Sequence, residues 1–197
     1  MSQTHILSGG FDSPATGSAQ AFRAAMEAMA RPGTIETLSG GTGPAPLSDA
    51  AATLLLTLCD TTTPLFLGAS HDTDDIRAWL AFHTGAPIAR REDAQFALGT
   101  WSDLAPLGAY ATGTPEYPDR SVTLIVEMPE LSNTGAVLRG PGIEETTRLN
   151  LPDPQAHQAN RALFPLGFDC FFTAGNRVAG LPRSTDVTAQ PVAAEEV

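Results

Sequence analysis

Lysine is absent from this sequence, and all 11 of its basic residues are arginine. A pyridoxal phosphate enzyme needs a lysine amine for its Schiff base, and a Walker A loop needs a lysine on the phosphates. Both classes are therefore excluded in their usual form. Arginine binds carboxylates and phosphates through paired hydrogen bonds, so anionic ligands remain possible. A GC-rich coding bias that replaces lysine with arginine is the simpler explanation.

Cysteine, positive charge and long apolar runs are also scarce. Cys59 and Cys170 lie inside apolar stretches and outside any CxxC pair, which indicates buried, reduced thiols in a cytoplasmic protein. The formal net charge of −11 disfavours nucleic-acid binding, which normally needs a basic surface. No run of about 18 apolar residues exists, and the first residues lack the features of a signal peptide, so we expect no membrane segment.

The residue pattern predicts one α/β domain with a mixed β-sheet flanked by helices. Residues 1–16, rich in Ser, Gly and Pro, are expected to form a flexible N-terminal arm, residues 17–187 the domain and residues 188–197 an acidic tail. The expected helices are 17–30, 48–58, 72–84 and 153–163. The expected strands are 34–38, 64–69, 95–100, 121–128, 136–139, 145–149, 168–173 and 177–181.

Two of the expected helices have apolar residues at helical spacing. Phe22, Met26 and Met29 recur at i, i+4 and i+7, which places them on one face of the first helix. His83 extends the apolar stripe of helix 72–84, so its ring nitrogens need partners. A core histidine bonded to a carbonyl is the simpler interpretation, and a functional histidine is the alternative.

The C-terminal part of the domain reads as a hairpin with a polar exit. Gly175 and Asn176 separate two strand-like segments, as in a two-residue turn. Pro182 ends the pairing, and Arg183 follows it at a position where binding groups often lie. The loop 101–120 is long enough to indicate a functional or interaction surface.

Chemical motifs are few. His71, Asp72 and Asp75 could supply metal ligands, but acidic residues at the start of a helix also cap its free amides. The capping interpretation is the simpler one, because no HxxxH, HExxH or HxH pattern occurs. No GxSxG elbow occurs either, so the residues carry no autonomous catalytic signature.

Several segments together resemble the PhnH family of the bacterial carbon–phosphorus lyase system. They are AFRAAMEAMARPG (21–33), TLLLTLCDTTTPLFL (53–67), FHTGAP (82–87), SVTLIVEM (121–128), LRGPGI (138–143) and FPLGFD…LPRST (164–185). They occur in the family's order from about Ala19 to Val187, which is most of the chain. No single segment is diagnostic, but the ordered set is specific.

The resemblance implies a role in phosphonate utilisation. It implies a subunit that supports formation of α-D-ribose 1-methylphosphonate 5-triphosphate from ATP and methylphosphonate, in a complex with PhnG, PhnI, PhnJ and PhnK and functionally with PhnL. It also implies a homodimer whose fold is similar to the large domain of PLP-dependent transferases but lacks their cofactor site. A purely structural scaffold subunit is the alternative, and neither implies activity of the chain alone.

The family supplies no catalytic residues to transfer, and none is assigned, nor any metal ligand. We select His83, Arg139, Asp169 and Arg183 as candidate binding residues. His83 and Asp169 interrupt apolar segments, whereas Arg139 and Arg183 leave strand ends where they could meet phosphate or the acidic groups of a partner. For each residue, a structural hydrogen bond or ion pair is the simpler interpretation. We expect no cofactor in this chain.

Overall fold

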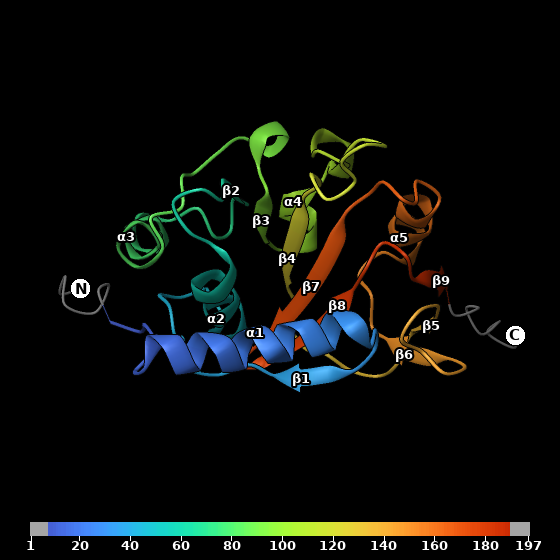
Figure 1. Ribbon diagram of the computed structural model, residues 1–197, viewed down its shortest axis with the longest axis horizontal. Helices are drawn as coiled ribbons and strands as arrows, with labels where there is room; N and C mark the ends of the chain where they lie inside the picture. Colours follow the sequence, from blue (N-terminus) through green and yellow to red (C-terminus); the bar gives the residue numbers. More distant parts are fainter. Residues whose placement is uncertain (1–7, 190–197) are drawn as a thin grey trace, which may run out of the picture.

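Six strands form the central sheet in the order β1–β8–β7–β4–β3–β2 (Figure 1). The computed structural model describes residues 8–189, so residues 1–7 of the expected arm and 190–197 of the expected tail lie outside the described residues. The strands are β1 (Ile35–Thr37), β2 (Leu65–Leu67), β3 (Phe96–Gly99), β4 (Thr123–Glu127), β7 (Asp169–Ala174) and β8 (Arg177–Leu181). The neighbours β2, β3, β4 and β7 are parallel, and β8 and β1 are antiparallel. This confirms an α/β domain with a mixed sheet.

The hairpin of β7 and β8 forms as expected. Ala174 pairs with Arg177, which leaves Gly175 and Asn176 as the two-residue turn. Gly175 has a φ of 58°, and among residues 8–189 no residue other than glycine has a positive φ. A positive φ at the first central position alone is typical of a type II′ turn, which suits the twist of a hairpin.

Four expected helices are present as α1 (Pro14–Ala30), α2 (Asp49–Leu58), α3 (Asp74–His83) and α5 (Pro154–Arg161). Side-chain caps define three of the starts, because Ser48, Thr73 and Asp153 each accept a hydrogen bond from the amide three residues later. The segment expected as a loop at 101–120 instead contains α4 (Trp101–Leu104) and a 3-10 helix (Leu107–Ala109); another 3-10 helix is at Arg91–Asp93.

The sheet is buried on both faces. Ile125 of β4 packs with residues of α1, α2 and α3, whereas its neighbours Leu124 and Val126 pack with α4 and the C-terminal part of the chain. Alternating side chains of a strand point to opposite faces, so a strand buried on both faces is a continuous apolar run. This explains why SVTLIVEM is so apolar.

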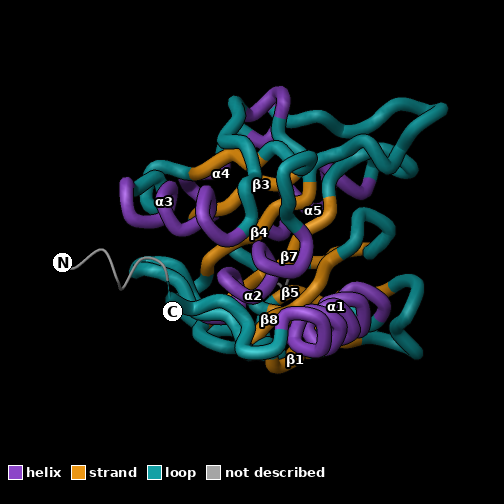
Figure 2. The backbone as a smooth tube through the Cα atoms, turned by 60° about the vertical axis from the view of Figure 1, so that its left-hand side comes forward, coloured by secondary structure: helices purple, strands orange, loops and turns teal. Residues whose placement is uncertain are grey.

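Helix α1 buries a different stripe from the expected one. Its buried residues are Ala21, Ala25 and Ala28, whereas Phe22 and Met26 are 50% and 52% exposed. The small stripe lets the helix approach the sheet closely. Both views show α1 lying along β8 and β1 (Figures 1 and 2). A Cβ atom at Gly180 of β8 would lie 2.7 Å from the backbone oxygen of Ala28, so helix and strand meet backbone to backbone.

A second sheet, of three strands, packs beside the central sheet. Its central strand β5 (Ala136–Arg139) pairs antiparallel with β6 (Thr147–Leu149) and β9 (Asp186–Thr188). Strand β9 was not expected from the sequence, which indicated only a polar exit from the hairpin. None of the helices within residues 8–189 combines the length and apolarity needed to cross a bilayer.

Candidate functional site

A polar cluster lies at the carboxyl ends of the parallel strands. Glu127 ends β4, Ser70 and His71 follow β2, and Asp103 follows β3. Helix α2 also begins here, because the Ser48 amide donates to a Glu127 carboxylate oxygen at 2.8 Å. Ligands of open α/β sheets bind outside the carboxyl ends of the strands. The position in the fold therefore makes this cluster the candidate functional site.

Glu127 is a carboxyl group largely removed from water. Its side chain is 10% exposed. Oε1 accepts the Ser48 amide hydrogen, and Oε2 accepts from the Thr173 hydroxyl at 3.0 Å. Burial disfavours the charged form and raises the pKa of Glu127, although these hydrogen bonds oppose the shift. Glu127 therefore holds a proton more readily than an exposed glutamate does.

His71 faces Glu127 and is 2% exposed. Its Nε2 atom lies 3.8 Å from Glu127 Oε1 and has no hydrogen-bond partner, whereas Nδ1 lies 2.7 Å from Ser70 Oγ. Burial lowers the pKa of His71, and the nearby Asp103 charge opposes that change. The imidazole is thus held neutral, with one nitrogen directed at the carboxyl group.

Ser70 and Asp103 connect this pair to the surface. Ser70 is exposed, and its hydroxyl contacts Asp103 Oδ2, which also accepts the Ser70 amide at 3.2 Å and the Thr100 hydroxyl at 2.8 Å. These hydrogen bonds, the Ser70 hydroxyl first, lower the pKa of Asp103. Asp103 is therefore ionised and acts as the acceptor.

The arrangement can hold or move a proton. A neutral histidine beside a buried carboxyl group is a general acid–base combination. Burial lowers the pKa of His71 and raises the pKa of Glu127, so the proton affinities of the two groups approach each other.

A metal site has no such support within residues 8–189, where no group of three or more His, Cys, Asp or Glu side chains is placed to hold an ion. Cys59 and Cys170 are free and buried, and burial raises the pKa of both thiols.

Two of the four candidate binding residues contact each other, at the opposite end of the strands. The Arg183 guanidinium donates to both carboxylate oxygens of Asp169, at 3.1 and 2.6 Å, to the Pro118 carbonyl at 2.8 Å and to the Ser121 hydroxyl. The Arg183 amide also donates to Asp169 at 2.8 Å. The contacts of both residues are those of a structural ion pair that joins β7 to the start of β4.

The other two lie apart from this pair and from each other. His83 ends α3, where its ring packs 4.9 Å from the Trp79 ring and its Nε2 atom has no hydrogen-bond partner. Arg139 ends β5 and is exposed; within residues 8–189 it forms no ion pair, although Asp186 stands opposite it in β9. A ligand-binding role for the four residues stays a prediction.

The residues around His71 cap a helix. Asp72 pairs with Arg77, and Thr73 caps α3, whose first turn contains Asp74 and Asp75. Sequence reasoning found His71 but missed its partner Glu127, which stands 56 positions away. One signal was available: Glu127 is the charged residue at the end of an otherwise apolar strand, the position where binding groups of parallel sheets lie.

Comparisons with known proteins identify the family. The model for the bacterial phosphonate metabolism protein PhnH matches residues 9–188. A curated relative from Rhizobium meliloti (strain 1021), the α-D-ribose 1-methylphosphonate 5-triphosphate synthase subunit PhnH, is 40% identical over 192 residues, which cover 93% of this chain and 96% of the relative. Both agree with the resemblance found in the sequence. The chain therefore belongs to the PhnH family of bacterial phosphonate metabolism proteins.

Proposed function

We propose that this chain is a subunit of the synthase that makes α-D-ribose 1-methylphosphonate 5-triphosphate from ATP and methylphosphonate. The observation that carries the proposal is the 40% identity, over nearly the whole of both chains, to a relative named as a subunit of that synthase. PhnG, PhnI, PhnJ and PhnK are the proposed partners, with PhnL acting in the same step. The reaction belongs to a cytoplasmic complex, and this subunit contributes to it without activity of its own.

The test is coexpression with the other subunits followed by an assay for the ribose triphosphate product. We expect the chain to copurify with them, and we expect product from the complex but not from the isolated chain. Product formed by the isolated chain from ATP and methylphosphonate would contradict the proposed division of labour. A chain that neither copurifies nor alters product formation would contradict membership of the complex.

The fold is proposed to be similar to the large domain of PLP-dependent transferases without a cofactor site. Four parallel strands with helix starts at their carboxyl ends support the likeness, since cofactors of α/β proteins lie at that edge. The absence of lysine supports the missing cofactor site, because no side-chain amine is present to form the Schiff base. Mixing the protein with pyridoxal phosphate is expected to produce no Schiff-base absorbance.

Arg139 is the proposed contact for the triphosphate or for an acidic group of a partner. Its guanidinium is exposed and forms no ion pair within residues 8–189, whereas that of Arg183 is held by Asp169, Pro118 and Ser121. Arg139→Ala is expected to lower product formation by the complex. Arg177→Ala removes another exposed arginine at a strand end and serves as the matched control. Equal activity of the two variants would argue against the assignment.

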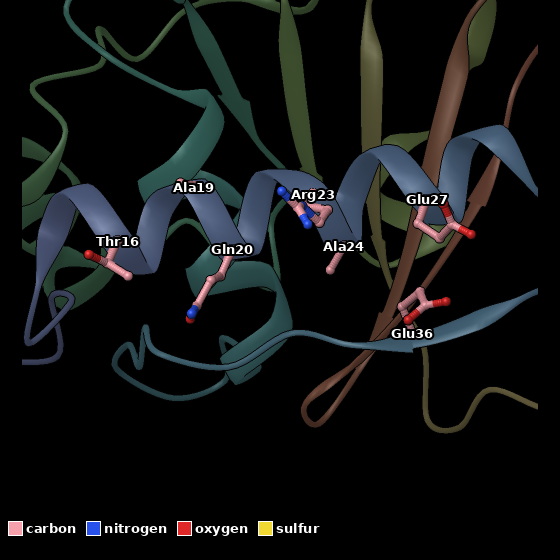
Figure 3. Close-up of a pocket in the computed structure, with 7 residues that line it drawn as sticks. All are labelled: Thr16, Ala19, Gln20, Arg23, Ala24, Glu27 and Glu36. Carbon is pink, nitrogen blue, oxygen red and sulfur yellow. The ribbon is translucent and has the colours of Figure 1, made fainter.

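The exposed side of α1 is the proposed surface for a second copy of the chain. Phe22 and Met26 project from it, and beside them Arg23 and Glu27 line an open groove of about 540 Å³ between α1 and β1 (Figure 3). Two α1 helices packed antiparallel about a two-fold axis would place Arg23 of each copy near Glu27 of the other, because the interface is the same patch on both copies. The surface therefore carries charges of both signs and two exposed apolar side chains, and Glu27 also pairs with Arg31 of its own helix at 3.0 Å.

A Phe22→Glu, Met26→Glu double variant tests this interface by light scattering. We expect a dimer for the unchanged protein and a monomer for the variant, since four carboxylates would meet in the interface. Phe82→Glu on α3 is the control, because Phe82 is 59% exposed but lies on another helix. A variant that remains dimeric, or a monomeric unchanged protein, would refute the interface while leaving the proposed subunit role intact.

A further inference from the structure

We propose that His71 and Glu127 form a buried site for a single exchangeable proton, and that Ser70 and Asp103 form its route to the surface. The site is a candidate general acid–base group, and nothing in the family assignment requires it. Its ligand is the proton itself. The inference is carried by four side chains from three strand ends. Asp103, Ser70 and His71 Nδ1 are joined by hydrogen bonds, and His71 Nε2 lies 3.8 Å from Glu127 Oε1, a gap that must shorten by about 1 Å for a proton to pass.

The number of hydrogens available to these side chains leaves His71 Nε2 without a hydrogen and without a donor. Ser70 has one hydroxyl hydrogen, and two atoms that could accept it lie within hydrogen-bond distance of its oxygen, Asp103 Oδ2 and His71 Nδ1. The Asp103 carboxylate takes that hydrogen, so Nδ1 must carry its own hydrogen and donate it to Ser70 Oγ. A neutral imidazole with its hydrogen on Nδ1 has a bare lone pair on Nε2, the atom directed at Glu127 Oε1.

A lone pair opposite an ionised carboxylate is unfavourable where water is absent, and one proton removes the conflict. Placed between Nε2 and Oε1, the proton gives either a carboxyl group that donates to the imidazole or an imidazolium that donates to the carboxylate. Both keep the pair neutral overall. Nothing else can neutralise it, because neither side chain forms an ion pair or hydrogen bond with an arginine within residues 8–189.

The proton can leave along the same chain by a balanced set of transfers. Glu127 gives its proton to Nε2, Nδ1 gives its proton to Ser70 Oγ, and Ser70 gives its hydroxyl proton to Asp103. Three bonds to hydrogen break and three form, histidine stays neutral, and the hydrogen has moved from Nδ1 to Nε2. Asp103 then releases the proton to water or to a group bound at the exposed Ser70 hydroxyl. The Ser48 amide and the Thr173 hydroxyl remain as donors to the ionised Glu127.

The charged groups around the pair set its titration. Asp103 is the nearest further charge; it acts on His71 through Ser70 and favours retention of the proton. On the α2 side Glu127 meets a backbone amide, and on the β7 side a hydroxyl, both neutral. Because the two groups share one proton, they titrate as a pair and a single pKa belongs to both.

Solution NMR of the full chain labelled with ¹³C and ¹⁵N at histidine and glutamate measures the position of this hydrogen directly. The Cδ2 shift of His71 distinguishes the Nδ1–H from the Nε2–H tautomer, and the carboxyl carbon shift reports ionisation of Glu127. We expect both signals to change together in one step, at a higher pH than an exposed glutamate would need, because burial raises the pKa of Glu127. Separate steps, or a His71 that is Nε2–H throughout beside an ionised Glu127, would overturn the proposal.

Two variants test the two ends of the His71 ring. Glu127→Gln removes the carboxyl group that titrates, while its carboxamide oxygen can still accept the Ser48 amide hydrogen, so the His71 tautomer should no longer change with pH. Ser70→Ala removes the acceptor of the Nδ1 hydrogen and should favour the Nε2–H form by about fivefold, the value of one net hydrogen bond. His157 is the internal control, since it is 3% exposed, and both variants should leave its spectrum unchanged. A tautomer change that survives Glu127→Gln would refute the shared proton, and the unchanged protein alone decides the matter if that variant does not fold.

Discussion

Glu127 and Asp169 lie at opposite ends of the parallel strands, and each is a carboxyl group taken largely out of water. The Asp169 side chain is 25% exposed and meets Arg183, which donates three hydrogen bonds to it. The Glu127 side chain is 10% exposed and meets neutral donors and the unpartnered nitrogen of His71. One carboxylate has its counter-charge built in, whereas the other depends on a proton that solvent can supply or remove.

The difference teaches where stability and reactivity reside in this fold. A charge pair whose donors are nearly all used is costly to disturb and offers little to a ligand. A buried acid–base pair with one unmet hydrogen-bonding position can change its protonation state at modest cost. Sequence inspection selected Asp169 and Arg183 as candidate binding residues, with a structural ion pair as the simpler interpretation, whereas the structure places an acid–base pair at the opposite edge of the sheet.

Removal of Asp169 is expected to produce the largest effect. Asp169→Ala leaves the Arg183 guanidinium, whose side chain is 13% exposed, without its carboxylate, and should lower the free energy of unfolding by about 3 to 4 kcal/mol in urea titrations. Asp186→Ala breaks the ion pair with Arg161, in which the side chains are 60% and 36% exposed, and should cost less than about 1 kcal/mol. Equal losses of free energy of unfolding in the two variants would show that the Asp169–Arg183 ion pair stabilises the fold no more than an exposed ion pair does.

His157 is a second buried histidine, whose pKa the Asp153 carboxylate at the start of α5 raises only in part against burial, and it sharpens the comparison with His71. It packs 5.1 Å from the Trp101 ring, and burial lowers its pKa from 6.5 to about 4. The unfolded chain therefore binds the proton first as the pH falls. The free energy of unfolding is therefore unaffected by His157 above pH 6.5, and it should fall by up to about 3 kcal/mol as the pH approaches 4.

His157→Phe removes that titration and keeps an aromatic ring in the cluster. Urea unfolding at several pH values should show the unchanged protein losing stability below pH 6.5 relative to the variant. Curves that stay parallel from pH 7 to about pH 4 would mean that His157 is protonated equally in the folded and unfolded states.

Thr173→Val tests the hydrogen bonds of Glu127 and should have the smallest effect. Thr173 is fully buried, and its hydroxyl donates to Oε2 at 3.0 Å, so its loss should cost about 1 to 2 kcal/mol where Glu127 is ionised. Because burial raises the pKa of Glu127, the cost should shrink as the pH falls and the carboxyl group protonates. Thr123→Val, at the other end of β4, is the control and should change stability by less than about 0.5 kcal/mol. A loss of free energy of unfolding that does not depend on pH would show that Thr173→Val acts through packing and not through its hydrogen bond to Glu127.

The sequence predicted the central sheet well because its signals are local. Apolar runs bounded by Gly, Pro or a capping Ser or Thr located every strand of the large sheet and most helix starts. Strand β9 was missed because Asp186–Thr188 is only three residues long and is defined by pairing with β5, far away in the chain. The site was missed for the same reason, since no local pattern relates His71 to Glu127.

Helix α1 shows a different failure. Ala21, Ala25 and Ala28 repeat with the same i, i+4, i+7 spacing as Phe22, Met26 and Met29, so periodicity offers two possible buried faces. Residue size favoured the wrong one. The deciding partner was Gly180, a residue of the neighbouring strand that admits only a small stripe.

That backbone-to-backbone contact also fixes how α1 is presented to its surroundings. A helix seated on glycine has no intervening side chain to change rotamer, so it cannot roll or settle without a clash between the two main chains. Phe22 and Met26 are consequently held at a set height and angle above the sheet. A second copy that docks on this proposed surface would lose little conformational entropy there, and substitution of Gly180, which is buried, should weaken that proposed association by shifting α1.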